Sequence, residues 1–276
     1  MKRFDPLILA AIAAALLMQI IHLDEAALWF DETWTAQQIQ LGWRDIVPEL
    51  LFGDYNANHL PLYFMLLKLW TAVAGNSPMA LRLPSVVLSL ITLILIAGIA
   101  RTMISEKAAR WAAWLAAVSP YLLHHAQEAR MYPLMSALAA ASIFLLARYL
   151  NGNASKLGTS FVLVNLALLT THYYSMFIVS AVLLVPLVLL RRPLTSWLPA
   201  VCISGAGIIG LMLMAILIAG HHSGETYDTG LIAFPGVVWS MISGYTLMPS
   251  SEELHALGIR AALPYLPVAL ITVIPI

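Results

Sequence analysis

Charge and cysteine are both scarce in this chain of 276 residues. Charged residues make up 10% of the chain, the formal net charge is +0, and Cys202 is the single cysteine. One cysteine excludes an intramolecular disulfide and a cysteine-based metal framework. The balanced charge gives no indication of nucleic-acid binding. Apolar residues are abundant instead: 61% of the chain is hydrophobic, which places it in the membrane class.

Long apolar runs predict an all-α fold, a polytopic transmembrane helix bundle of about eight spans of roughly 20 residues each. The first run, Leu7–Leu23, follows a basic start but lacks a small-residue cleavage pattern at its end, so we interpret it as a retained span. We treat residues 1–276 as one transmembrane domain. The apolar runs are 7–23, 60–75, 81–100, 111–123, 131–150, 159–171, 176–190, 197–220, 231–247 and 261–276.

Basic residues predict the orientation of these spans. Lys2 and Arg3 place the N-terminus in the cytoplasm by the positive-inside rule. Residues 24–80 then form the first extracytoplasmic loop, in which the run 60–75 is expected to be an interfacial helix. Residues 220–260 form a later outer loop. We expect a multi-pass protein of the cell (plasma or inner) membrane, in contact with membrane lipids and without a nucleic-acid partner.

Two polar turns on the predicted outer face follow unusually short apolar arms. The arms 111–123 and 159–171 have thirteen residues each and lead into HHAQEARMY and THYYS. Thirteen residues give about 20 Å of helix, whereas the hydrocarbon core is about 30 Å thick. Polar backbone below the membrane surface needs protein or water around it. The turns are therefore predicted to line an outward-open cavity under the first loop.

Carboxylates, imidazoles and guanidinium groups gather in the segments predicted to lie outside. Asp31 and Glu32 directly follow the first span among aromatic residues, where charge is costly to place. Arginine binds phosphate through a planar fork, and a carboxylate can act as a general base. Carboxylate and imidazole together can hold a divalent cation. The candidate residues are Asp31, Glu32, Asn58, His59, Arg82, Glu128, Arg130, Tyr132, His172 and Tyr173.

Each of these residues also has a structural interpretation. Asp31 and Glu32 can cap a helix that begins near Thr33. Glu128 and Arg130 can pair and anchor their turn. Arg82 can extend to the lipid headgroups, and Tyr173 can be an interfacial anchor. His59 can be an interfacial residue whose hydrogen bonds are satisfied, and His124 and His125 can be solvated loop residues. The functional interpretation therefore depends on their joint placement on one face.

Five segments carry a resemblance to a known family. DETWTAQQI, NHLPLYFMLLKLW, GNSPMALRLPSVV, SPYLLHHAQEARMYPLM and LLTTHYYSMF occur in this order within residues 1–190. Together they resemble the GT-C membrane glycosyltransferases, in particular the protein mannosyltransferase-like branch that includes the aminoarabinose transferases. The resemblance implies a polyprenyl-phosphate sugar donor, an extracytoplasmic acceptor (protein, lipid or glycan) and inverting transfer.

The resemblance also implies roles for the candidate residues. Asp31 matches the catalytic base of the first outer loop, with Glu32 beside it, and Glu128 matches a second catalytic acid. It implies donor-phosphate contacts by the position of Asn58 and His59 and a recurring histidine at His172. The candidate substrate-binding residues are Asn58, His59, Arg82, Arg130, Tyr132, His172 and Tyr173. A divalent metal cation is a candidate cofactor, with Glu128, His59 and His172 as candidate ligands. Relatives usually continue through further spans, so a C-terminally shortened member is expected.

A transporter or lipid-sugar flippase is the main alternative from another class, and a non-catalytic scaffold is a third. A transporter is expected to carry ionisable groups near the midplane of the membrane. Here the charged groups gather on one predicted face, which favours the enzyme. The sequence names neither the sugar nor the acceptor.

Overall fold

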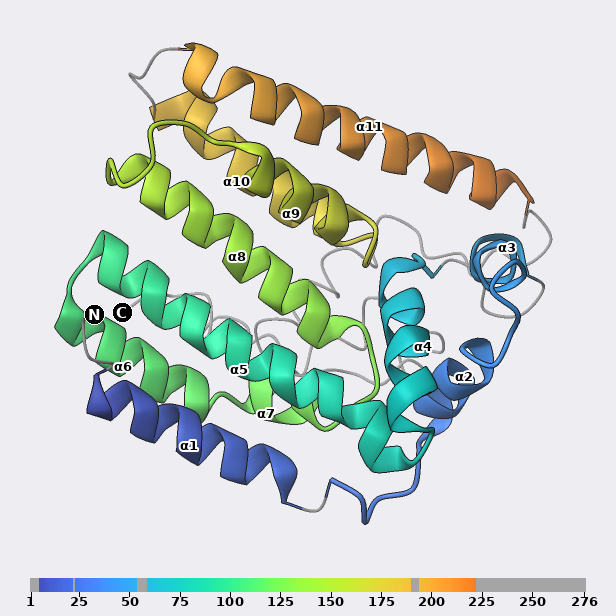
Figure 1. Cartoon of the computed structure of the whole chain (residues 1–276). Coiled ribbons are helices and arrows are strands. Elements are labelled where there is room, and N and C mark those ends of the chain that lie inside the picture. Colours follow the sequence, from blue (N-terminus) through green and yellow to red (C-terminus); the bar gives the residue numbers. More distant parts are fainter. Residues whose placement is uncertain (1–4, 22, 54–58, 190–193, 222–276) are drawn as a thin grey trace, which may run out of the picture. The chain divides into compact units, whose positions relative to one another are not determined.

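The computed structural model describes residues 5–21, 23–53, 59–189 and 194–221 (Figure 1). It divides the chain into two compact units, of which Met1–His221 contains every described residue. Asn58 and the runs 231–247 and 261–276 lie outside the described residues. The described helices are α1 (Pro6–Ile20), α2 (Phe30–Gln38), α3 (Ile46–Phe52), α4 (Leu62–Ala74), α5 (Pro78–Met103), α6 (Glu106–Ala117), α7 (Pro120–Ala126), α8 (Tyr132–Leu150), α9 (Thr159–Leu169), α10 (Ser175–Leu189), η1 (Leu194–Ser196, a 3-10 helix) and α11 (Leu198–His221).

The described part is all helical and contains no strand, which confirms the all-α part of the predicted fold class. The helices α1, α5, α6, α8, α9, α10 and α11 run side by side as a bundle (Figure 1). Helix α5 lies between α6 and α8 and packs on both, and it also contacts α1. On the other side of α8, the helices α9, α10 and α11 pack against one another.

Two helices of the bundle are long and apolar enough to cross a membrane. They are α5, with 26 residues, and α8, with 19. Shorter apolar helical segments accompany them: α1, α4, α9, Ser175–Leu184 of α10 and Leu198–Met214 of α11. Large apolar side chains on the outside of the bundle, such as Leu115 and Leu163, are exposed as expected of a surface that faces lipid. The predicted number of about eight spans, their orientation and the single domain stay predictions.

Uncharged polar side chains join the bundle helices where apolar packing surrounds them. The Gln19 side-chain amide donates to Ser89, 3.0 Å away, and thereby joins α1 to α5. Ser142 donates to the Asn165 amide oxygen (2.6 Å), and Asn165 donates to Ser204 (3.3 Å). Helices in lipid associate through such hydrogen bonds because apolar burial does not drive them together there.

The predicted arm 111–123 is wrong as a single helix. It divides into α6 and α7 at Val118 and Ser119. The cause is Pro120, which has no N–H and forces the preceding residue out of the helical region; Ser119 has ψ 119°. Pro120 then starts α7 as its first residue, a position that tolerates proline. The second arm is one helix, α9, as expected.

The run 60–75 forms α4, which runs across the direction of the bundle (Figure 1). Two side chains of α4 bind it to its neighbours. Lys68 donates to the carbonyls of Ile39 and Leu41 just beyond the end of α2 (2.7 and 2.6 Å). The Trp70 indole donates to the Ala80 carbonyl (2.8 Å). That carbonyl lacks its usual partner because the residue four positions on is Pro84, which has no N–H.

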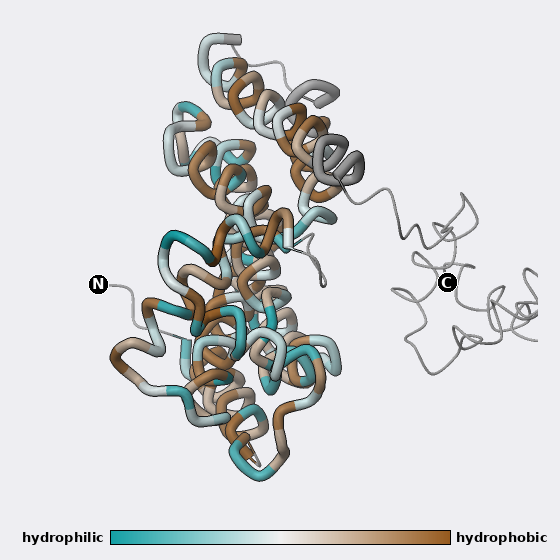
Figure 2. The backbone as a smooth tube through the Cα atoms, turned by 90° about the vertical axis from the view of Figure 1, so that its right-hand side faces the viewer, coloured by the Kyte–Doolittle hydropathy of each residue, from teal (hydrophilic) through white to brown (hydrophobic). Residues whose placement is uncertain are grey.

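The charged groups of the described residues lie mainly at the two ends of the bundle. One end, here named the first-loop end, is formed by α2, α3, α4 and the turns 127–131 and 170–174 (Figure 1). Viewed from this end, hydrophilic stretches stand among hydrophobic helices (Figure 2). At the opposite end Arg101 binds Glu106 and Arg110 binds Asp5, each at 2.7 Å.

Candidate functional site

A buried ion pair joins the first loop to α5. Glu32, in the first turn of α2, is fully buried, and its carboxylate receives two bonds from Arg82, 2.8 Å from Nε and 2.7 Å from Nη2. The backbone N–H of Ala129 donates to the same carboxylate at 2.8 Å. Glu32 therefore connects α2, α5 and the 127–131 turn.

Arg82 has no capacity left for a ligand. Besides its two bonds to Glu32, its guanidinium donates to the carbonyls of Leu23, Ala26 and Ala27 at 2.8 to 3.2 Å. A guanidinium has five N–H donors, and all five are used. Arg82 and Glu32 are buried and occupied by each other, which favours structural roles for both; the expected substrate contact of Arg82 and the expected catalytic role of Glu32 stay predictions.

Asp31 has the opposite environment. Its side chain is 35% exposed, and it contacts Arg130 through Oδ2, 3.3 Å from Nη2. Arg130 Nη1 also lies 3.4 Å from both the Asp31 carbonyl and the Thr35 hydroxyl. Thr35 donates to the Asp31 carbonyl at 2.8 Å. The first loop and the 127–131 turn thus bring Asp31 and Arg130 together, as the sequence predicts.

Arg130 is buried but poorly bonded. Its side chain is 6% exposed, its contacts are all 3.3 to 3.4 Å long, and its Nε has no hydrogen-bond partner. A buried guanidinium with unused donors is costly unless an anion completes its coordination. Arg130 therefore has the properties of an anion-binding group, whereas Arg82 has those of a structural one.

Aromatic and imidazole rings of the first loop and of the two turns form close contacts. Tyr132 lies 4.7 Å from His125 and 5.8 Å from His172, measured between ring centroids. His59 stacks on Trp34 at 4.4 Å. The N–H of Leu62 donates to the Thr170 carbonyl at 3.2 Å, which fixes the start of α4 against the 170–174 turn. The two predicted polar turns and the first loop are therefore neighbours.

His172 is held in its neutral form. Burial, with the nearby positive charges of His59 and Arg130, lowers its pKa to about 4. Its Nδ1 lies 3.1 Å from the Tyr174 N–H and accepts from it, so the ring proton is on Nε2. His172 therefore offers one neutral N–H donor.

Glu128 is bound by two histidines of α7. Its carboxylate contacts two imidazoles, with His125 Nδ1 at 2.9 Å from Oε2 and His124 Nε2 at 3.3 Å from Oε1. His125 is only 17% exposed, so its interpretation as a solvated loop residue is wrong, whereas His124 is 69% exposed. The sequence analysis did not predict this contact because it assigned His124 and His125 to a loop. In the structure α7 extends through both histidines.

The remaining candidates and two residues that the sequence analysis missed complete the site. Tyr173 packs against the apolar core of α8 to α11, and its buried hydroxyl has no hydrogen-bond partner. Asn58 lies outside the described residues. Thr35 was missed, although its spacing of four residues from Asp31 on a helix predicts a contact. Ser85 was also missed; it donates to the Glu128 carbonyl at 2.6 Å.

An apolar groove of about 260 Å³ lies between α4, α5 and the start of α8. Tyr63 lines this groove, and its hydroxyl is buried without a hydrogen-bond partner. The residues that line the groove are Tyr63, Leu66, Leu67, Trp70, Leu83, Pro84, Val87, Leu88 and Leu134. A long apolar ligand whose polar end reaches Arg130 suits this arrangement.

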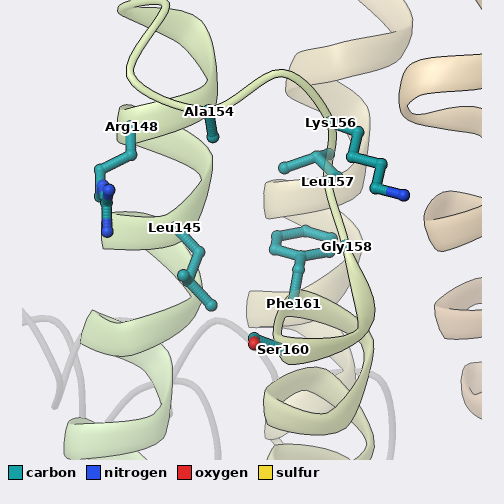
Figure 3. Close-up of a pocket in the computed structure, with 8 residues that line it drawn as sticks. All are labelled: Leu145, Arg148, Ala154, Lys156, Leu157, Gly158, Ser160 and Phe161. Carbon is teal, nitrogen blue, oxygen red and sulfur yellow. The ribbon is translucent and has the colours of Figure 1, made fainter.

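Another cavity of about 260 Å³ lies at the opposite end of the bundle, between α8 and the start of α9 (Figure 3). Arg148 and Lys156 line it, but their side chains point away from each other (Figure 3). Leu145, Leu157 and Phe161 supply most of its apolar wall. This cavity is remote from Asp31 and Arg130, so it does not belong to the candidate site.

The two neighbouring acids should respond differently to loss of charge. Glu32→Gln leaves Arg82 buried without its anion, and we expect a loss of about 3–5 kcal/mol in unfolding free energy. Asp31→Asn removes the charge from one long contact, and the asparagine amide oxygen can still accept from Arg130, so we expect a smaller loss than in Glu32→Gln. Unfolding of the full chain in detergent micelles measures both. Equal losses would contradict the division of roles.

The lowered pKa of His172 predicts a pH dependence of stability. The unfolded chain protonates this imidazole near its ordinary pKa of 6.5, whereas the folded chain does so near 4. Stability contributed by neutral His172 is therefore complete above pH 6.5 and declines as the pH falls from 6.5 toward 4. The thermal midpoint of the wild type should fall more steeply in this window than that of His172→Asn. Parallel curves would contradict the prediction.

Comparison with known proteins adds a family assignment to this geometry. None of the curated proteins compared with the chain matches it. Residues 58–219 match the dolichyl-phosphate-mannose-protein mannosyltransferase family, and this segment includes Arg82, Glu128, Arg130 and His172. The match covers more than half of the chain. The protein therefore belongs to the dolichyl-phosphate-mannose-protein mannosyltransferase family, the membrane glycosyltransferases of GT-C type.

Proposed function

We propose that the protein transfers a sugar from a polyprenyl-phosphate donor to an acceptor on the extracytoplasmic face of the cell membrane, with inversion at the anomeric carbon. The family supports sugar transfer. The observation that carries the finer proposal is the contrast between the two buried arginines. Arg82 is fully bonded within the protein, whereas Arg130 has unused donors beside an exposed carboxylate.

Arg130 binds the donor phosphate in this proposal. A guanidinium presents paired N–H donors to phosphate oxygens. His172 adds the neutral donor Nε2–H next to it, so positive charge is concentrated on Arg130. The leaving phosphate gains negative charge in the transition state, and donors already in position stabilise that charge most effectively.

Asp31 acts as the general base. Its carboxylate accepts the proton of the acceptor hydroxyl, whose oxygen forms the new bond to the anomeric carbon. The bond from that carbon to the phosphate oxygen breaks, and its electron pair leaves with the polyprenyl phosphate. Attack from the side opposite the phosphate inverts the anomeric configuration. The exposed position of Asp31 supports this role, since a base must reach substrate.

The prenyl chain of the donor lies in the groove between α4 and α5. The groove is lined almost entirely by apolar side chains, including Leu134 at the start of α8, the helix that directly follows the turn holding Arg130. Binding energy from a remote, unreactive chain can be used to hold the reacting end in place. A flippase is less well supported: among the described residues the buried charges Glu32, Arg82 and Arg130 lie at the first-loop end, whereas the buried polar contacts further along the bundle, such as those of Gln19 and Asn165, are uncharged.

Asp31→Asn tests the proposed base. The full chain in proteoliposomes is supplied with radiolabelled polyprenyl-phosphate mannose and a cell-envelope extract as acceptor. We expect transfer to fall by at least about 100-fold, the usual contribution of a general base. Asp24→Asn, an exposed acid of the same loop, is the control and should keep full activity. Asp31→Asn turnover within about threefold of wild type would exclude Asp31 as the base.

Val87→Trp tests the groove. The indole would fill the space assigned to the prenyl chain, and the apparent KM for a long-chain donor should rise at least about fivefold, equivalent to about 1 kcal/mol. Ile91→Trp lies one turn further along α5, is similarly exposed and does not line the groove, so it should leave KM unchanged. For a donor with a truncated prenyl chain, the apparent KM values of the two variants should differ less. Equal KM values for the long donor would place its chain elsewhere.

A further inference from the structure

The contacts of Glu128 at the end of α7 point to a metal-binding site. Its Oε1 lies 3.3 Å from His124 Nε2, and its Oε2 lies 2.9 Å from His125 Nδ1. One ligand atom from each of the three residues can be chosen so that all lie within 4.8 Å of one another. We propose that His124, His125 and Glu128 bind a divalent transition-metal ion of the Zn²⁺ class.

The spacing of these residues produces the site. His124 and His125 lie in the last turn of α7, which ends at Ala126, and Glu128 lies in the turn directly after it, four and three residues further along the chain. The adjacent histidines reach the carboxylate through different ring atoms, Nε2 and Nδ1. Two neighbours in sequence can thereby approach one ion.

Contacts around the three residues hold them in position. The His125 ring lies between Tyr121 (4.5 Å) and Tyr132 (4.7 Å). The Glu128 carbonyl accepts from Ser85, and the next N–H, of Ala129, is bonded to Glu32. Outer contacts that orient ligands are part of what gives a metal site its affinity.

The donor set selects the type of ion. Two imidazoles and one carboxylate are ligands of the kind found in zinc sites that keep a fourth position open. Mg²⁺ and Ca²⁺ prefer oxygen ligands and suit this set poorly. The open position can take water. If the proposed function is correct, a phosphate oxygen of the donor is the second candidate, since Arg130 is only two residues from Glu128.

The ligand set differs from the one expected from the sequence. Glu128 was an expected ligand together with His59 and His172. His172 Nδ1 instead accepts from the Tyr174 N–H, and His59 stacks on Trp34. His124 and His125, which the sequence analysis interpreted as solvated residues, occupy the ligand positions.

Metal binding by the full chain tests the site without reference to sugar transfer. Protein in detergent micelles, freed of its purification tag and stripped with EDTA, is titrated with Zn²⁺ by calorimetry and with Co²⁺ by visible absorption. We expect one ion per chain, no competition by excess Mg²⁺, and at least about a tenfold loss of affinity in His124→Ala, His125→Ala and Glu128→Gln. Because His124 is the most exposed ligand, His124→Ala is the variant least able to disturb folding.

His172→Asn and His59→Asn are the matched controls and should bind Zn²⁺ with wild-type affinity. Helix content and elution volume establish that each variant is folded. Absence of stoichiometric binding would overturn the proposal and leave a hydrogen-bonded cluster. Unchanged affinity in His124→Ala and His125→Ala, or a loss confined to the two controls, would also overturn it. Failure of sugar transfer with intact Zn²⁺ binding would count against the proposed function alone.

Discussion

The Glu32–Arg82 ion pair is the contact on which the geometry of the site depends. Both side chains are sealed from water, so each needs the other, and their bonds connect α2, α5 and the 127–131 turn. Asp31 precedes Glu32 in the sequence, and Arg130 follows Ala129, whose N–H is bonded to Glu32. Their mutual position therefore follows from a pair whose hydrogen bonds are made within the protein. Two adjacent acids thus have separate tasks, one fixing the backbone and the other facing outward.

Much of the helical framework could be predicted from apolar runs and their length. The runs at 81–100, 131–150 and 197–220 correspond to α5, α8 and α11, and 60–75 corresponds to the transverse α4. The division at Ser119 was not predicted because the run of thirteen residues was identified by its apolarity alone. Pro120 forces the backbone of Ser119 out of the helical region, and apolarity does not indicate this effect. Apolarity alone does not report such local backbone constraints.

The site could be predicted as a gathering of residues but not as a set of contacts. That Asp31, Arg130 and His172 lie in one region follows from topology and charge. Which of two adjacent acids binds Arg82 depends on the direction of each side chain from α2, and this is fixed by tertiary packing. The same holds for His125, whose burial between two tyrosines no sequence pattern indicates.

The proline in α5 has a consequence for how the groove is built. Pro84 leaves the Ala80 carbonyl without a helical donor, and the Trp70 indole takes that place. Restoring an N–H at position 84 would satisfy the carbonyl from within α5 and make the indole bond redundant. Positions 70 and 84 are thus expected to covary among relatives. Together they set the distance between α4 and α5, and this distance sets the width available to a lipid chain in the groove.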